Sequence, residues 1–224
     1  MRRAFTLIEL LVVIAVIAIL AAMLMPAIGM VRDGALQARC TNQARQIGLA
    51  LMGYANDHEG WIPGDRWDGG GTPSDMWVQQ TKSYIEDLKD PDQPAAFFAD
   101  PGMGRRSPLT DFWHSNYAMS IALAWHWDAT ANVAVFSGTF LDAIKGRSGV
   151  AMLLGGMRVD GRVIGPYHAR SPGIDGQDRF IWPHRGRRDS ILYADGHAGT
   201  LLFSELPKPA PADEGADPFW SPFR

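Results

Sequence analysis

The sequence has a single cysteine, Cys40, among 224 residues. A single cysteine excludes an intrachain disulfide and any zinc site built from several thiolates. An excess of either charge is also lacking, since 21 lysines and arginines stand against 24 aspartates and glutamates, which gives a net charge of −3. This balance does not predict a nucleic-acid partner. The fold class and function must therefore be inferred mainly from the pattern of apolar residues.

Common catalytic motifs are missing as well. The sequence has no Gly-x-Ser-x-Gly nucleophile motif and no His-Glu-x-x-His zinc motif. The glycine-rich stretch at residues 69–72 lacks the lysine of a phosphate-binding loop. We therefore expect a protein that is not an enzyme and that has no resident cofactor.

The N-terminal segment lacks polar side chains over the whole range from Leu10 to Met25. As a helix, residues 5–25 would be about 31 Å long, which matches the hydrocarbon core of a bilayer. Arg2 and Arg3 precede the apolar run. They predict a single-pass membrane protein with a cytoplasmic N-terminus and a C-terminal domain on the opposite side, which for an inner membrane is the periplasmic side.

Three kinds of segment have this composition. A secretory signal peptide needs small residues at a cleavage site, but no Ala-x-Ala pair occurs between Ala15 and Ala22. A plain signal anchor leaves Glu9 unexplained, because a carboxylate within an apolar span costs on the order of 2.5–3.5 kcal/mol to insert. The third kind is a segment that is processed and then assembled, and the residues around Glu9 favour it.

The stretch Ala4-Phe5-Thr6-Leu7-Ile8-Glu9 resembles the processing motif of prepilins, the family of type IV pilins and pseudopilins. The resemblance implies that prepilin peptidase cuts between Ala4 and Phe5 and that the new amine of Phe5 is methylated. Glu9 is then the fifth mature residue. Pro26 is the twenty-second, where many members have a proline that loosens the helix. Ala4 departs from the glycine that is usual before the cut.

The charge of Glu9 suits assembly. The ammonium of a mature Phe5 and the Glu9 carboxylate of a neighbouring subunit can neutralise each other in an apolar filament core, where an unpaired charge is costly. Ala15, Ala18 and Ala22 recur at helical spacing and allow close helix packing, although ordinary membrane-helix composition also explains them. The resemblance implies other pilin-like subunits, an inner-membrane assembly platform and membrane lipid as partners.

Helical periodicity continues beyond Pro26, now with a single apolar face. That face comprises Leu36, Cys40, Ala44, Ile47, Leu51 and Tyr54. The pattern predicts one helix over residues 5–57, apolar in its first half and amphipathic in its second. We interpret Cys40 as a small buried residue rather than a reactive thiol.

The rest of the chain indicates an α+β fold of the pilin-like kind, in which the long N-terminal helix packs on a small antiparallel β-sheet with irregular insertions. We expect a leader over residues 1–4, a globular domain over 58–204 and an extended proline-rich tail over 205–224. Apolar spacing predicts a helix over 75–88 and strands over 133–136, 150–154 and 190–194. Asp195-Gly196 is a two-residue hairpin signal before a last strand over 197–203.

This hairpin carries a second resemblance. His184, Asp195, Gly196 and His197 resemble the C-terminal signature of a pilin-like family, in which a histidine, nine residues and Asp-Gly follow one another. Here ten residues separate His184 from Asp195. Where members often have Cys-Pro, this chain has Asp100-Pro101, and residues 116–119 also resemble a family segment.

Metal-binding chemistry is present in two places. His184, Asp195 and His197, together with Asp189, offer ligands for Zn²⁺ or another divalent ion. The alternative is structural, with Asp195 as a turn residue and His184 as a hydrogen-bonding lock on the hairpin. Asp65, Asp68 and Asp75 offer oxygen ligands for Ca²⁺, but their spacing matches no calcium loop. A separate basic cluster, formed by Arg185, Arg187 and Arg188, is more typical of a solvated loop than of a binding site.

These patterns together predict a structural subunit of a type IV pilus-like or type II secretion-like filament, anchored in the inner membrane or exported in an extracellular filament. The alternative is a membrane-anchored periplasmic protein that binds a metal or another ligand and does not polymerise.

Overall fold

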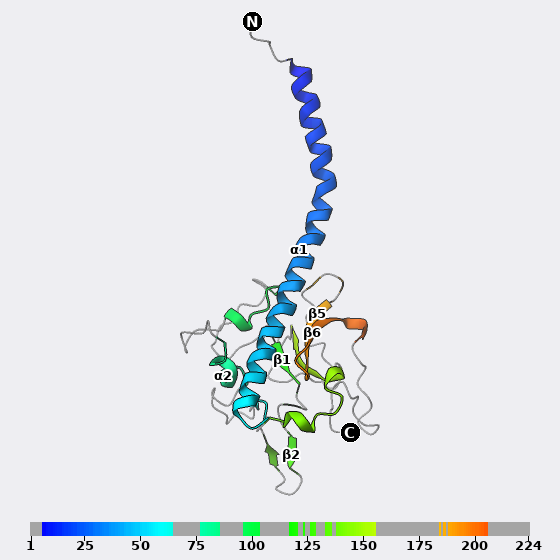
Figure 1. Cartoon of the computed structure of the whole chain (residues 1–224). Helices are drawn as coiled ribbons and strands as arrows, with labels where there is room; N and C mark the ends of the chain where they lie inside the picture. The colour runs from blue at the N-terminus through cyan, green and yellow to red at the C-terminus, as the bar shows by residue number, and fades with distance from the viewer. Residues whose placement is uncertain are drawn as a thin grey trace. The chain divides into compact units, whose positions relative to one another are not determined.

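The computed structural model describes residues 6–64, 77–85, 96–103, 117–120, 123, 126–128, 133–135, 138–155, 184, 186 and 188–205. The chain divides into two units, residues 1–36 and 37–224. One helix, α1 (Leu7–Asp57), supplies the described part of the first unit and the opening of the second (Figure 1).

Helix α1 has 51 residues and is therefore about 76 Å long. It continues through Pro26 without a break, although a proline inside a helix removes one backbone donor and crowds the preceding turn. The helix ends where Glu59 and Gly60 take positive φ angles of 53° and 90°. The Gly60 N–H donates to the carbonyl of Ala55 at 2.7 Å, which is the closing bond of a Schellman motif. The predicted helix is confirmed from Leu7 onward.

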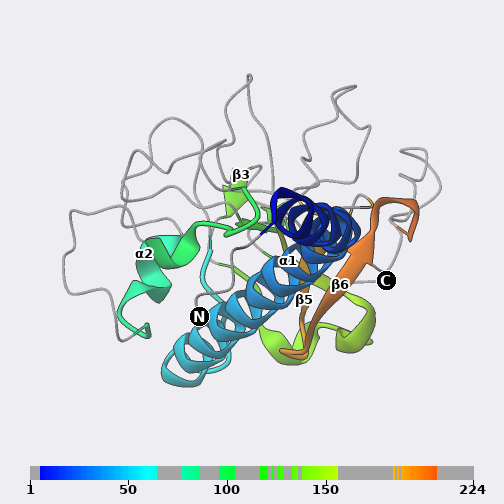
Figure 2. The ribbon, with the colours of Figure 1, turned by 90° about the horizontal axis from the view of Figure 1, so that it is seen from above.

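The later turns of α1 bury one face. Its buried residues are Cys40, Ala44, Ile47, Gly48, Ala50, Leu51 and Ala55, which confirms the predicted apolar face, with Leu36 and Tyr54 half-buried at its margins. The helix lies very close to β5 (Arg188–Tyr193), as Gly48 shows: a Cβ there would come within 2.6 Å of Leu192. Figure 2 shows these turns running beside β5 and β6 (Ala198–Leu202).

The main sheet has four antiparallel strands in the order β1-β4-β5-β6. These are β1 (Tyr117–Met119), β4 (Ala151–Gly155), β5 (Arg188–Tyr193) and β6 (Ala198–Leu202). A second, two-stranded sheet pairs β2 (His126–Asp128) with β3 (Val133–Val135), and a short helix α2 covers Trp77–Lys82. The α+β architecture of a long helix on a small antiparallel sheet is thus confirmed.

The core lies between α1 and the main sheet. Ile47 and Leu51 of α1 share one apolar cluster with Leu153 and Leu192 of the sheet. Aromatic side chains from outside the sheet extend this cluster, and the rings of Trp77 and Phe98 meet edge to face with centroids 5.5 Å apart. The strands of the main sheet have only three to six residues, and their apolar side chains are buried mainly against α1 and its neighbours.

Several predicted elements need correction. The last hairpin has a three-residue loop, not a two-residue turn, since the Tyr193 N–H donates to the His197 carbonyl at 2.9 Å. Gly196 has φ 88°, the left-handed glycine that such a loop requires. The predicted helix over 75–88 is described only as the six residues of α2. Strands β1 and β2 were not predicted, because three residues carry too little alternation to be recognised.

Packing of α1 on the sheet should dominate the stability of the second unit. Leu51→Ala should lower the free energy of unfolding by about 2–5 kcal/mol, because Leu51 is fully buried and its loss leaves a cavity. Leu49→Ala is the matched control, since Leu49 is 69 % exposed on the same helix. Urea unfolding of the detergent-solubilised chain, followed by tryptophan fluorescence, measures both. Equal effects of the two substitutions would contradict this packing.

Candidate functional site

The start of α1 is closed by a capping box. The Glu9 N–H donates to Thr6 Oγ1 at 3.3 Å, and Glu9 Oε2 accepts from the Thr6 N–H at 2.8 Å. The Thr6 hydroxyl also donates to Glu9 Oε2 at 2.8 Å. Thr-x-x-Glu is the sequence pattern of such a cap. The interpretation of Glu9 as an assembly charge missed this local role, although the pattern was present to be read.

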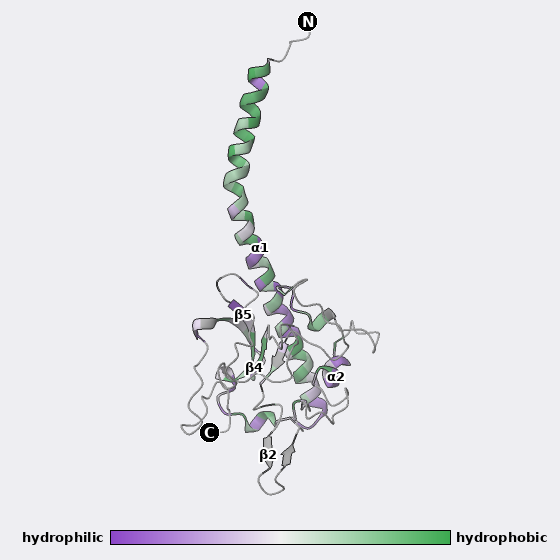
Figure 3. Cartoon of the chain, turned by 180° about the vertical axis from the view of Figure 1, so that it is seen from behind, coloured by the Kyte–Doolittle hydropathy of each residue, from purple (hydrophilic) through white to green (hydrophobic). Residues whose placement is uncertain are grey.

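The segment that follows the cap is apolar on every side. Its large apolar side chains are at least 49 % exposed, and they are Leu7, Ile8, Leu10, Leu11, Val12, Val13, Ile14, Val16, Ile17, Ile19, Leu20, Met23, Leu24, Met25, Ile28, Met30 and Val31. Figure 3 shows this part of α1 as almost uniformly hydrophobic. By length and composition α1 could cross a membrane. A surface of this kind calls for lipid or for other apolar helices around it.

The predicted signature divides into two parts: Asp195, Gly196 and His197 lie together on the hairpin, and His184 belongs to another group of side chains. Asp195 and Gly196 lie in the loop, and His197 follows it. His197 Nδ1 lies 2.5 Å from Asp195 Oδ1, and the His197 ring stacks on Tyr193 with centroids 4.2 Å apart. Partial burial alone would raise the pKa of Asp195, but the hydrogen bonds from the backbone and ring of His197 outweigh it and lower the pKa. This is a local turn contact at the protein surface.

His184 lies in a different environment. It is buried, with 7 % of its surface exposed, and it forms an isolated antiparallel bridge with Arg188 at the start of β5. Within the described residues, the group of metal-ligand side chains that contains His184 includes neither Asp195 nor His197. His184 is joined there by Cys40 and Asp100 instead.

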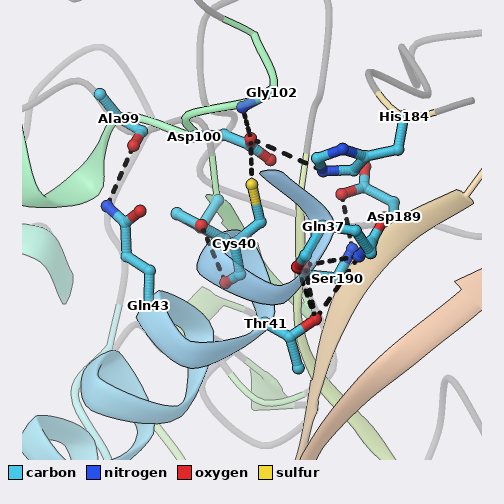
Figure 4. A network of polar contacts seen from close by, with 11 residues as sticks. Gln37, Cys40, Thr41, Gln43, Ala99, Asp100, Gly102, His184, Asp189 and Ser190 are labelled. Carbon is cyan, nitrogen blue, oxygen red and sulfur yellow. Dashed lines mark hydrogen bonds and ion pairs between the residues drawn. The ribbon is translucent and has the colours of Figure 1, made fainter. Parts of the chain in front are cut away.

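The buried group formed by Cys40, Asp100 and His184 draws on three distant segments (Figure 4). Cys40 comes from α1, Asp100 from the segment 96–103 and His184 from the approach to β5. The Cys40 thiol donates to Asp100 Oδ1 at 2.9 Å, and His184 Nε2 lies 4.0 Å from the same oxygen. One ligand atom from each residue lies within 4.8 Å of the other two.

Asp100 and Asp189 are two buried carboxyl groups in this part of the core. Burial raises the pKa of the Cys40 thiol, and the Asp100 carboxylate adds to the rise. Burial also raises the pKa of Asp189, again with a contribution from the charge of Asp100. Asp100 Oδ1 accepts from the Gly102 N–H at 2.6 Å and Asp189 Oδ1 accepts from the Ser190 N–H at 2.7 Å. The backbone thus holds both carboxylates in place.

Two glycines let the backbone approach these side chains. A Cβ on Gly102 would lie 2.5 Å from Cε1 of His184, and one on Gly155 would lie 2.2 Å from Oδ1 of Asp189. Such separations are far below van der Waals contact. Only glycine therefore fits beside the imidazole and the carboxylate without a shift of the chain.

A polar seam connects the buried group to the rest of α1. Gln37 donates to Ser190 Oγ at 3.2 Å, and the Thr41 and Ser190 hydroxyls lie 3.3 Å apart. The Gln43 amide donates to the carbonyl of Ala99 at 3.0 Å and also to that of Phe97. Hydrogen bonds from α1 thus reach strand β5 and the segment 96–103 that supplies Asp100.

Sequence reasoning located part of this arrangement. The burial of Cys40 is confirmed, since it is fully buried, but its contacts with Asp100 and His184 were missed. Sequence analysis singled out Asp100-Pro101, but no local spacing links Asp100 to Cys40, which lies 60 residues earlier.

Some predicted residues lie outside the described part of the chain. These are Ala4 and Phe5, Asp65, Asp68 and Asp75, Arg185 and Arg187, and the tail from residue 206 onward. Arg188 is described and lies exposed on β5. The cleavage site, the calcium-ligand residues and the basic cluster therefore remain predictions.

Comparison with known proteins identifies the first segment. Residues 1–25 match the family model of the prokaryotic N-terminal methylation motif. No curated protein and no solved structure matches the chain significantly. The match ends before the body begins, so the C-terminal signature at His184, Asp195, Gly196 and His197 stays a prediction.

The buried thiol should be protected from reagents. Native protein should show no reaction of Cys40 with a small alkylating reagent over hours, because the side chain is buried and its raised pKa keeps it protonated. Denatured protein should react fully. Leu49→Cys in a Cys40→Ala background is the control, since this exposed position on α1 should react at once. Mass spectrometry reads the extent of labelling, and rapid native labelling of Cys40 would show that the described burial is wrong.

Proposed function

We propose that this prepilin-like chain is a structural subunit, a pilin or pseudopilin, of a type IV pilus-like or type II secretion-like filament, and that it has no enzymatic role. The observation that carries the proposal is the methylation motif at residues 1–25. The motif supports processing by prepilin peptidase and assembly with other pilin-like subunits. The choice of filament system and the rank of the subunit within it belong to the proposal alone.

The apolar part of α1 suits a subunit that changes surroundings. Before assembly its exposed side chains would lie in the lipid of the inner membrane, and after assembly they would contact the same helix of other subunits. Ala15, Ala18 and Ala22 lie at helical spacing within this segment, where small residues allow helices to approach closely. The same apolar surface can therefore serve as an anchor and as filament core.

Glu9 would have two functions in this scheme. In the single chain its carboxylate closes the capping box with Thr6. A carboxylate has about four lone-pair sites, so it can retain the cap and still accept the Phe5 ammonium of a neighbouring subunit. Neutralisation of that ammonium would favour insertion of a new subunit into an apolar core.

The membrane orientation follows from the flanking charges. Arg2 and Arg3 precede the apolar segment, and basic residues stay on the cytoplasmic side. Cleavage between Ala4 and Phe5 would thus take place at the cytoplasmic face, and the body would lie in the periplasm beside the assembly platform.

Substitutions at Glu9 separate its charge from its capping role. Glu9→Gln keeps the capping box, since glutamine serves at this position as glutamate does, but it removes the charge. We expect normal membrane insertion and a loss of filament incorporation on the order of a hundredfold, because an unpaired buried ammonium costs several kcal/mol. Filament incorporation of Glu9→Ala should fall to the same extent. The ratio of subunit in sheared filaments to subunit in membranes, measured by immunoblot, gives the result.

Thr6→Val is the matched control, because it removes the capping hydroxyl and keeps the carboxylate. It should assemble within a few-fold of the wild type if the charge is what matters. Wild-type levels of Glu9→Gln in filaments would overturn the role of Glu9. A wild-type chain that is never recovered outside the membrane fraction, in cells that assemble filaments, would favour a non-polymerising membrane-anchored binding protein.

A further inference from the structure

We propose that Cys40, Asp100 and His184 bind one Zn²⁺ ion, which joins α1, the segment 96–103 and the approach to β5. The site lies wholly in the second unit of the chain and does not depend on the filament proposal. It also differs from the predicted set of His184, Asp195 and His197, of which it keeps only His184.

The separations among the donor atoms suit a tetrahedral ion. Zinc lies about 2.3 Å from sulfur, about 2.0–2.1 Å from imidazole nitrogen and about 2.0–2.2 Å from carboxylate oxygen, so its ligand atoms are about 3.4–3.6 Å apart. Asp100 Oδ1 lies 2.9 Å from Cys40 Sγ and 4.0 Å from His184 Nε2. These two distances lie on either side of the tetrahedral value, and shifts of less than an ångström would satisfy it.

The chemistry of the donors selects the metal. Ca²⁺ and Mg²⁺ take oxygen ligands, whereas sulfur and imidazole nitrogen suit Zn²⁺ and its transition-metal neighbours. A Cys40 thiolate and an Asp100 carboxylate balance the two positive charges of the ion, with His184 neutral. Asp189 is buried but lies outside the ligand group.

The backbone around the three donor side chains holds them in place, as outer hydrogen bonds do in metal sites. The Gly102 N–H donates to Asp100 Oδ1, and outer hydrogen bonds of this kind orient ligating carboxylates. Gly102 also lacks the Cβ that would collide with the His184 imidazole. All three ligand residues are buried, and with three protein ligands a single water molecule would take the fourth position of the tetrahedral ion. A bound ion would connect segments 60 residues apart at Cys40 and Asp100, in a chain that has no second cysteine for a disulfide.

A metal-free arrangement explains the same contacts differently. A protonated His184 can pair with Asp100, and the Cys40 thiol can donate to the same carboxylate. The two arrangements differ at sulfur, because Zn²⁺ must displace the thiol proton before it binds. The decisive measurement therefore needs a signal from a metal-bound thiolate and not from stability alone.

The test uses the full chain in detergent, stripped of metal with a chelator. Titration with Zn²⁺ against a chromophoric chelator should give one site per chain. Replacement of Zn²⁺ by Co²⁺ should produce a thiolate-to-cobalt charge-transfer band, and Cys40→Ser should abolish it. His184→Ala should weaken Zn²⁺ binding by more than the roughly 10–100-fold that loss of an outer-shell partner costs.

His197→Ala is the matched control, because His197 lies on the exposed hairpin loop with Asp195. It should leave the affinity for Zn²⁺ and the cobalt spectrum unchanged. Three outcomes overturn the proposal: a helical wild-type chain that binds no stoichiometric Zn²⁺, a Co²⁺ complex without a thiolate band, or full-affinity binding by His184→Ala. Where His184→Ala fails to fold by circular dichroism, the cobalt spectrum of the wild-type chain decides.

Discussion

Burial of one face of α1 between Cys40 and Ala55 is the interaction on which the second unit depends. Ile47 and Leu51 are fully buried there and share a single cluster with the central strands of the sheet. Gly48 allows the helix to lie directly against Leu192. Because the strands are short, apolar burial against the helix supplies stabilisation that strand pairing alone would not give. Hydrogen bonds from Gln37, Thr41 and Gln43 beside this face connect the same helix to β5 and to the segment of Asp100.

In the first unit the apolar side chains of α1 are exposed rather than buried. From Leu7 to Val31 the large apolar side chains of α1 are exposed, and the only charge among them, Glu9, lies at the capped start of the helix. Such a segment has to be covered by lipid or by other helices. A single helix thus has one environment before residue 36 and another after it, without a break at Pro26. The subunit that we propose would use the exposed part for the membrane and the filament, while the later part carries the body.

Local patterns were readable from the sequence, and long-range ones were not. The length of α1 and its buried face follow from helical spacing, and Asp195-Gly196 marks the hairpin although its loop is one residue longer than predicted. The buried group around Cys40 could not be found in this way, because its members lie 60 or more residues apart and meet only in the folded chain. His184 was therefore grouped with its neighbours in sequence, Asp195 and His197, rather than with its neighbours in space.

The central claim is that α1 is the processed assembly helix of a prepilin-like subunit. It rests on the methylation motif at residues 1–25 and on the exposed apolar segment that follows. Mass spectrometry of the N-terminal peptide, from chain purified out of the membranes of a cell that has prepilin peptidase, tests it most directly. The account predicts a chain that begins with N-methylated Phe5 and lacks residues 1–4. A chain that retains Met1 in that setting would contradict it.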